Sequence, residues 1–401
     1  MQRSMTLFTS GNLTEHTLYS IWVWVWGSNP TPNRTHNVRA QSFCPIENND
    51  VEVGVTMEKV PEIYANSKII LSMAGSGNPW DYFKPSSKLT LRALHDGYSL
   101  VEIQRLFQVS EEELWERISL LIDANLVKKE NEEYYPTFLI VDEEETKKTF
   151  HHAEKIGRII ADELSYGLEE LKTEFSKLEI SKEHAIDDLS LVLIGSKILD
   201  IGLLEVLVKD RTLLRPAPKR PSPERPDAQY YFFMIDGQPE HLGKYGEDSK
   251  DLPWENWTFV TFGQNIVKNR NNVPREKLEE RCNEVLKKQE LEKPEDLAEE
   301  LNVLILSRED SLAWRKTAKK VANQIFLKIK EKEKELLQFY NSLKVSRYAN
   351  NSLGEFMCWY IHIAYAWAID FLVEEKAIFI PDEKFGSLII YTEGPQGLLA
   401  K

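Results

Sequence analysis

Residues 99–137 read SLVEIQRLFQVSEEELWERISLLIDANLVKKENEEYYPT. Ser99 with Glu102, and Ser110 with Glu113, have the S-x-x-E spacing of a capping box, so a helix is predicted to begin at each serine. Apolar residues then recur every three or four positions, which indicates one buried face on each helix: Leu100, Ile103, Leu106, Phe107, Leu114, Ile118, Leu121 and Ile122. This stretch therefore predicts two helices joined by a short turn.

The flanking residues complete a larger unit. A helix through Leu89 to Leu94 is expected before this pair, ended by Asp96 and Gly97. Strand-like segments at Leu126-Val127 and Tyr135–Val141 follow it, separated by a charged turn. Three helices with a tight turn and a two-stranded wing are the pattern of a winged helix-turn-helix.

Residues 86–141 thus resemble the winged-helix domains of the ArsR/MarR-type transcriptional regulators. The resemblance implies that the third helix enters the major groove of double-stranded DNA and that the wing contacts backbone phosphates. Carried over to this chain, it implies the following DNA-binding residues, with Glu111 beside them: Arg105, Glu112, Trp115, Glu116, Arg117, Lys128 and Lys129.

The chain departs from that family in its charge. Residues 84–142 contain seven Lys or Arg and eleven Asp or Glu, and four of the acids lie at the start of the third helix. Carboxylates repel DNA phosphates, although an acidic first turn also suits the helix dipole. Two functions therefore stay open: a DNA-binding regulator with an attached effector-sensing domain, and an adaptor whose acidic winged helix binds a protein.

The rest of the chain divides by composition into a mainly α protein with α+β parts. Residues 1–56 contain no lysine and are expected to be a disordered or mis-annotated extension, with a genuine arm as the alternative. Residues 57–84 are a lead-in with a flexible turn at 74–77, and 85–142 are the winged helix. Residues 143–213 form helices that the resemblance assigns to a homodimer interface. Residues 214–228, with five prolines, are expected to be a spacer.

Residues 229–401 are expected to form a C-terminal α+β domain. Strands are predicted at 230–235, 257–262 and 387–391, with helices at 275–289, 294–304, 311–343 and 352–376. Residues 238–254 are expected to be a loop. Its aromatic and polar side chains predict a small-molecule or protein effector site. The predicted ligand-binding residues lie within 238–257 and are His241, Tyr245, Trp254 and Trp257.

No catalytic, metal or cofactor motif is recognised, so an enzyme in the C-terminal domain is a third alternative to the two binding functions. Cys358 and His362 share one helix face, but the apolar residues around them favour a packed core over a metal site. The same helix is interrupted by Asp370, which argues against a membrane span. Three widely spaced cysteines favour a cytoplasmic protein, and a net charge of −14 argues against a membrane surface. The resemblance implies a prokaryotic protein.

Overall fold

The computed structural model describes Tyr64 and residues 67–76, 79–84, 86–221, 226–263, 275–287, 291–348, 351–380 and 387–392. Predictions for residues 1–56 lie outside the described residues. Most of the described chain is helical, with three small sheets among the helices. A mainly helical chain with mixed α and β parts is therefore what the structure shows.

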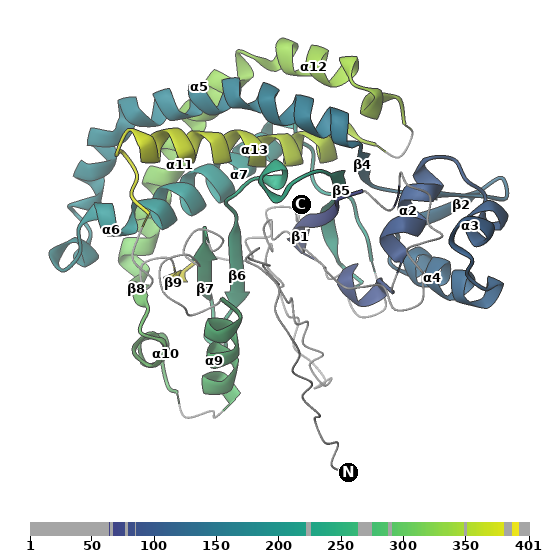
Figure 1. Ribbon diagram of the computed structural model, residues 1–401. Helices are drawn as coiled ribbons and strands as arrows, with labels where there is room; N and C mark the ends of the chain where they lie inside the picture. Colours follow the sequence, from purple (N-terminus) through teal and green to yellow (C-terminus); the bar gives the residue numbers. More distant parts are fainter. Residues whose placement is uncertain are drawn as a thin grey trace, which may run out of the picture.

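Three helices and a hairpin form a unit at one end of the molecule, in blue in Figure 1. Helices α2 (Ser87–His95), α3 (Leu100–Phe107) and α4 (Glu111–Asp123) precede the antiparallel pair β2 (Val127–Glu130) and β3 (Glu133–Pro136). Both predicted capping serines accept a hydrogen bond from a backbone N–H three residues on, which fixes where α3 and α4 begin. Their own cluster of apolar side chains includes Leu91, Ile103, Ile118 and Leu121, all fully buried.

A second sheet joins three distant parts of the chain. Strand β5 (Gln229–Asp236) lies between β1 (Ile69–Ser76), which is antiparallel to it, and β4 (Leu139–Val141), which is parallel. The flexible turn predicted at 74–77 is wrong for 74–76, which lie in β1 because β5 supplies their hydrogen-bond partners. The strand predicted at 135–141 is two strands, since its last residues leave the hairpin for this sheet.

The proline-rich segment is held against the body of the protein by Arg220. This side chain is 3% exposed and donates to the carbonyl oxygens of Tyr230 and Thr137 and, at 2.6 Å, to the Glu355 carboxylate. Lys219 also forms a β-bridge with Gln229. Residues 214–221 are therefore packed, and the prediction of a free spacer is wrong for them.

The centre of the molecule is a bundle of long helices. Helix α5 (Glu143–Phe175) runs along α13 (Leu353–Glu374), with α11 (Arg308–Lys330) beside it (Figure 1). A Cβ on Gly157 would lie 2.5 Å from that of Trp367, so α5 and α13 approach this closely only with glycine there. By length and hydropathy α13 is the one described helix that could cross a membrane, but 78% of its 18-residue apolar window is buried in the protein.

The helices around this bundle differ in part from the prediction. The helix expected over 311–343 is two helices, because α11 ends at Lys330 and α12 (Glu333–Ser342) turns back so that Leu336 and Tyr340 pack on the core. The apolar segment before the proline-rich stretch forms α6 (Ile186–Ser190), a π-helical segment (Leu191–Asp200) and α7 (Ile201–Asp210). Short 3-10 segments are Pro79–Tyr82, Glu179–Lys182, Pro239–Leu242 and Lys344–Arg347.

The third sheet lies in the C-terminal half. Its strand order is β6 (Glu247–Asp251), β7 (Trp257–Phe262), β9 (Ser387–Tyr391) and β8 (Leu304–Leu306). Helices α9 (Arg275–Lys287) and α10 (Pro294–Leu301) complete this part of the chain, and side chains of both share an apolar cluster with the sheet. The loop prediction for 238–254 is wrong for 247–251, which form β6 and pair with β7 along the whole length of that strand.

Candidate interaction face of helix α4 and its hairpin

Helix α4 is positioned by its apolar stripe and its N-terminal cap. Leu114, Ile118 and Leu121 are buried in the apolar cluster that also contains side chains of α2 and α3, so the opposite side of the helix faces solvent. The Ser110 hydroxyl accepts from the backbone N–H of Glu113, and the carboxylates of the first turn complement the positive end of the helix dipole. The sequence of α4 thus fixes both its position and its exposed face.

The exposed face of α4 has a single sign of charge. Its exposed side chains are Glu111, Glu112, Glu113, Trp115, Glu116, Ser119 and Asp123. The one basic residue of the helix, Arg117, is only 3% exposed and forms an ion pair with Glu113. Every charged side chain that α4 presents to solvent is therefore a carboxylate.

The lysines of the hairpin are paired with carboxylates of the same hairpin. Lys128 lies 2.8 Å from Glu130, and Lys129 lies 2.6 Å from Glu132. The hydrogen bond that the Lys129 ammonium donates to Glu132 raises the pKa of Lys129 above its usual value. With Glu133 the hairpin has three carboxylates for two ammonium groups, so it adds no net positive charge to the face.

An aromatic pair lies where α4 meets the hairpin. The Trp115 indole is 40% exposed, and its ring packs edge-on against Tyr134 with centroids 5.7 Å apart. The Lys129 ammonium lies 5.7 Å from the centre of the Tyr134 ring. Tryptophan is enriched among the residues that contribute most to protein–protein contacts, so the exposed indole is the candidate anchor residue of this face.

The DNA-binding residues implied by the resemblance do not share one accessible face. Arg105 is exposed on α3, and Glu112, Trp115 and Glu116 are exposed on α4. The prediction that Arg117 contacts DNA is wrong, because its guanidinium is buried beside Glu113. Its position beside the buried stripe and four residues after a glutamate is a signal that could have shown this. Tyr134 was missed, since its contact with Trp115 crosses from the hairpin to the helix.

The four predicted effector-site residues lie in two different parts of the core. Tyr245 donates its hydroxyl to Asp370 at 2.8 Å, and the His241 ring packs against Phe150. Trp254 and Trp257 belong instead to the cluster of the third sheet, where Trp257 contacts Tyr391. The structure therefore does not bring the four side chains into one site. Asp370, for which the sequence named no partner, is satisfied by Tyr245 and by Lys244.

Cys358 and His362 face the interior, as the packed-core interpretation expects. His362 is fully buried, with Nδ1 2.6 Å from the Cys358 carbonyl oxygen and Nε2 3.7 Å from Asp200. Burial raises the pKa of Asp200 to about 7 and lowers that of His362 to about 3, so both are largely neutral between about pH 3 and about pH 7. Across the described residues, no three or more His, Cys, Asp or Glu side chains are arranged to hold a metal ion.

Comparison with protein families, with curated proteins and with solved structures finds no match to this chain. Its function therefore rests on its own geometry. That geometry gives one face with a clear chemical character, on α4 and the adjoining hairpin.

Proposed function

We propose that residues 86–141 are a winged helix that binds a basic protein surface, which makes the chain a protein-interaction adaptor. The observation that carries this proposal is the exposed face of α4, where every charge is negative and Trp115 is the large apolar group. A basic partner would pair with these carboxylates and cover the indole.

Electrostatics favour this partner over DNA. Phosphate attraction supplies most of the non-specific affinity of DNA-binding proteins, and the cations at this face, Lys84, Lys128 and Lys129, are each paired with a neighbouring carboxylate. Complementary charge speeds association with a basic surface and selects against acidic ones. A buried tryptophan at the centre of a contact commonly contributes the largest share of its binding free energy.

The homodimer implied by the resemblance needs a different surface from the one expected. Ile156, Ile160 and Leu164 of α5 are buried within the chain, where α5 runs along α13. These apolar residues already have intramolecular neighbours. The homodimer, the effector and the cytoplasmic location stay predictions.

Reversing the charge of two α4 glutamates tests the proposal, because it should weaken the binding of a basic protein and strengthen the binding of DNA. The full chain is immobilised and incubated with native lysate at about 50 mM and about 500 mM salt, and the retained proteins are quantified by mass spectrometry. We expect E112K/E116K and W115A to lose basic proteins that the wild type retains at low salt. The control E299K/E300K makes the same charge change on exposed residues of α10 and should retain them.

Binding of random-sequence duplex DNA is measured in parallel by fluorescence anisotropy. Two results would overturn the adaptor proposal. One is that the wild type binds the duplex and E112K/E116K binds it more tightly, since added positive charge on α4 favours DNA. The other is retention of the same proteins by the wild type and by E112K/E116K.

A further inference from the structure

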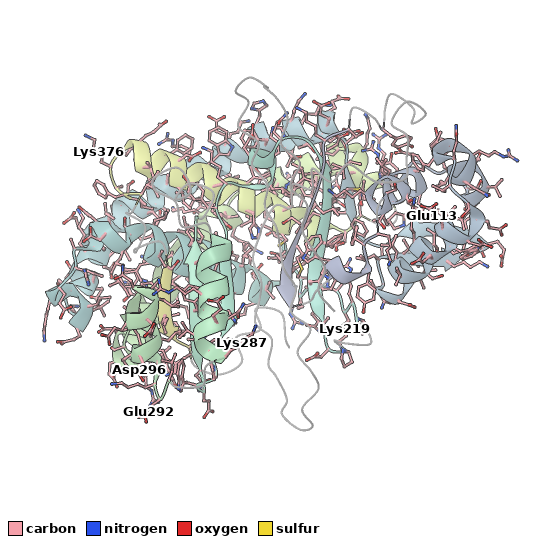
Figure 2. All side chains as sticks on the ribbon, turned by 60° about the horizontal axis from the view of Figure 1, so that its bottom comes forward. Glu113, Lys219, Lys287, Glu292, Asp296 and Lys376 are labelled. Carbon is pink, nitrogen blue, oxygen red and sulfur yellow. The ribbon has the colours of Figure 1, made fainter. Side chains whose placement is uncertain are left out.

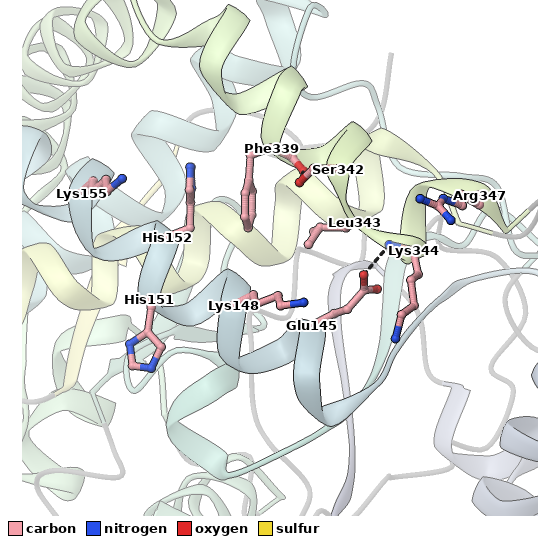
Figure 3. A pocket seen from close by; sticks show the side chains of 10 residues that line it. All are labelled: Glu145, Lys148, His151, His152, Lys155, Phe339, Ser342, Leu343, Lys344 and Arg347. Atoms are coloured by element: carbon pink, nitrogen blue, oxygen red, sulfur yellow. Dashed lines mark hydrogen bonds between the residues drawn. The ribbon is translucent and has the colours of Figure 1, made fainter.

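A basic pocket lies between helix α5 and the segment formed by α12 and the following 3-10 turn. Its volume is about 750 Å³, within the range of small-molecule sites. Figure 3 shows α5 along one side and residues 339–347 along the other. The lining residues are Glu145, Lys148, His151, His152, Lys155, Phe339, Ser342, Leu343, Lys344 and Arg347. The sequence gives no motif for this site, because its two walls are distant in the chain.

The one carboxylate that lines the pocket, Glu145, is hydrogen-bonded to the backbone rather than to a lining cation. Glu145 accepts hydrogen bonds from the backbone N–H groups of Lys344 and, at 2.9 Å, of Val345. Lys155 and Arg347 form no ion pair with any residue that the structure describes. In a chain with a net charge of −14 the lining has four cationic side chains and one acid.

Carboxylates next to the pocket limit the size of the anion that fits. Lys148 is paired with Glu144, and Lys344 lies 3.6 Å from Asp142 and 3.5 Å from Glu144. Neither of these acids lines the pocket. A long polyanion would have to pass them and be repelled, whereas a compact anion would contact the cations alone.

One part of the pocket offers a flat, uncharged wall. The His152 ring stacks on Phe339 with centroids 3.7 Å apart, and its Nδ1 lies 2.8 Å from the Tyr360 hydroxyl oxygen. Burial, together with the nearby Lys155 ammonium, lowers the pKa of His152 below its usual value, so this imidazole is neutral at pH 7. Leu343 extends the apolar surface.

We infer that this pocket binds a phosphorylated organic molecule of about nucleotide size. Its phosphate groups would contact Lys148 and Arg347 at one end of the pocket, its apolar part would lie against the His152–Phe339 pair, and a polar group at the other end would contact Lys155 (Figure 3). Charge-assisted hydrogen bonds from ammonium and guanidinium groups to phosphate are the strong interactions such a site uses. The inference holds whether or not α4 binds a protein, because the two surfaces share no residue.

The pocket is also connected to the winged-helix unit. Tyr348, which follows Arg347, packs on His95 of α2 with ring centroids 4.2 Å apart. The Asn351 amide oxygen accepts from the backbone N–H of Ile140 in β4, and its amide nitrogen donates to the Val345 carbonyl oxygen. An anion held by Arg347 would therefore restrain the segment that joins the pocket to α2 and β4.

Calorimetric titration of the full chain tests the inference with ATP, inorganic tripolyphosphate and adenosine as probes. We expect ATP to bind more tightly than either of the others, since tripolyphosphate lacks the apolar part of the ligand and adenosine lacks the phosphate groups. K155Q/R347Q should weaken ATP binding by about tenfold or more, the loss expected for a charged hydrogen bond. K209Q/K316Q removes two exposed lysines elsewhere on the protein and should bind ATP as the wild type does.

Thermal unfolding of each variant checks that the fold is intact, since neither Lys155 nor Arg347 forms an ion pair within the described part of the chain. Equal ATP affinity in the wild type and K155Q/R347Q would overturn the inference, as would no ATP binding at all. Tighter binding of single-stranded DNA than of ATP, abolished by K155Q/R347Q, would overturn the small-molecule class. E112K/E116K should leave ATP binding unchanged, which separates this result from the test of the α4 face.

Discussion

The α4 face and the pocket beside α5 use their charges in opposite ways. On α4 the basic residue Arg117 is buried in an ion pair, so the side chains left in solvent are acids. In the pocket the acid Glu145 is held by two backbone N–H groups, so the side chains left over are cations. Whether each surface is acidic or basic therefore depends on which charged side chains have partners inside the fold. A count of charged residues along the sequence does not predict it.

Arg220 and Glu355 show the limiting case, in which both charges are used. They lie 2.6 Å apart and are 3% and 2% exposed, between the proline-rich segment and the start of α13. Glu355 also accepts from the Ser352 hydroxyl, and Ser352 caps the same helix. Such a buried pair contributes to the fold and leaves no charged group exposed to bind another molecule. Figure 2 shows side chains over the whole body, with Glu113 at the α4 end and Lys219 in the proline-rich segment.

The largest effect is expected from breaking this fully internal pair. R220M leaves the Glu355 carboxylate buried without its partner and should lower the free energy of unfolding by about 3–5 kcal/mol. Urea denaturation measures it. K155Q, which removes a charge left in solvent, should change it by less than about 0.5 kcal/mol. A value for R220M as small as that for K155Q would mean that the distinction between internal and free charges is wrong.

A second prediction concerns Asp200, which the fold keeps neutral. Its pKa is raised from 3.8 to about 7, so between these values the folded chain holds a proton that the unfolded chain releases. The stability contributed by this carboxyl therefore falls as pH rises through that window. His362, with its pKa lowered to about 3, acts in the opposite direction and offsets it in the wild type.

Asp200→Asn removes the pH dependence that Asp200 contributes and leaves the opposite contribution of His362. The free energy of unfolding of the variant, relative to the wild type, should rise by about 1.4 kcal/mol per pH unit from about pH 4 to about pH 7. Urea titrations at intervals across this range give the slope. A difference that is independent of pH would show that Asp200 is ionised in the folded chain.

The smallest expected effect is a difference in the free energy of unfolding between substitutions of two basic residues, Arg117 and Lys129, to both of which the resemblance assigned a DNA contact. R117A removes a buried side chain and should lower the free energy of unfolding by about 1–3 kcal/mol. K129A removes an exposed ion pair within the hairpin and should change it by less than about 0.5 kcal/mol. Thermal or urea unfolding compares the two. Equal effects would place Arg117 in solvent, where the sequence prediction had it.

The sequence predicts best where structure depends on neighbouring residues. The two serine caps, the apolar stripes of α3 and α4 and the start of α13 at Ser352 follow from side chains within a few positions, and the structure has them there. The end of α11 was missed, because it depends on Leu336 and Tyr340 reaching a core built by other helices.

Features that depend on distant partners were not predicted. Strand β1 contains Gly75 and has no hairpin partner nearby, and only the far-off β5 makes it a strand. The basic pocket likewise depends on α5 and α12 meeting. The predicted effector residues failed for the same reason. Trp254 and Trp257 are near His241 in sequence, but they turn toward a different sheet.

The central place of β5 also bears on how this chain can be made and divided. Both edges of this strand are covered by segments from the first part of the sequence, and its residues 230–235 are all buried. A fragment that starts after the prolines would leave a two-edged, aromatic strand open to other chains, which favours aggregation. During synthesis β1 and β4 must likewise wait for β5 to leave the ribosome, so this sheet forms late and is the step that chaperones would protect.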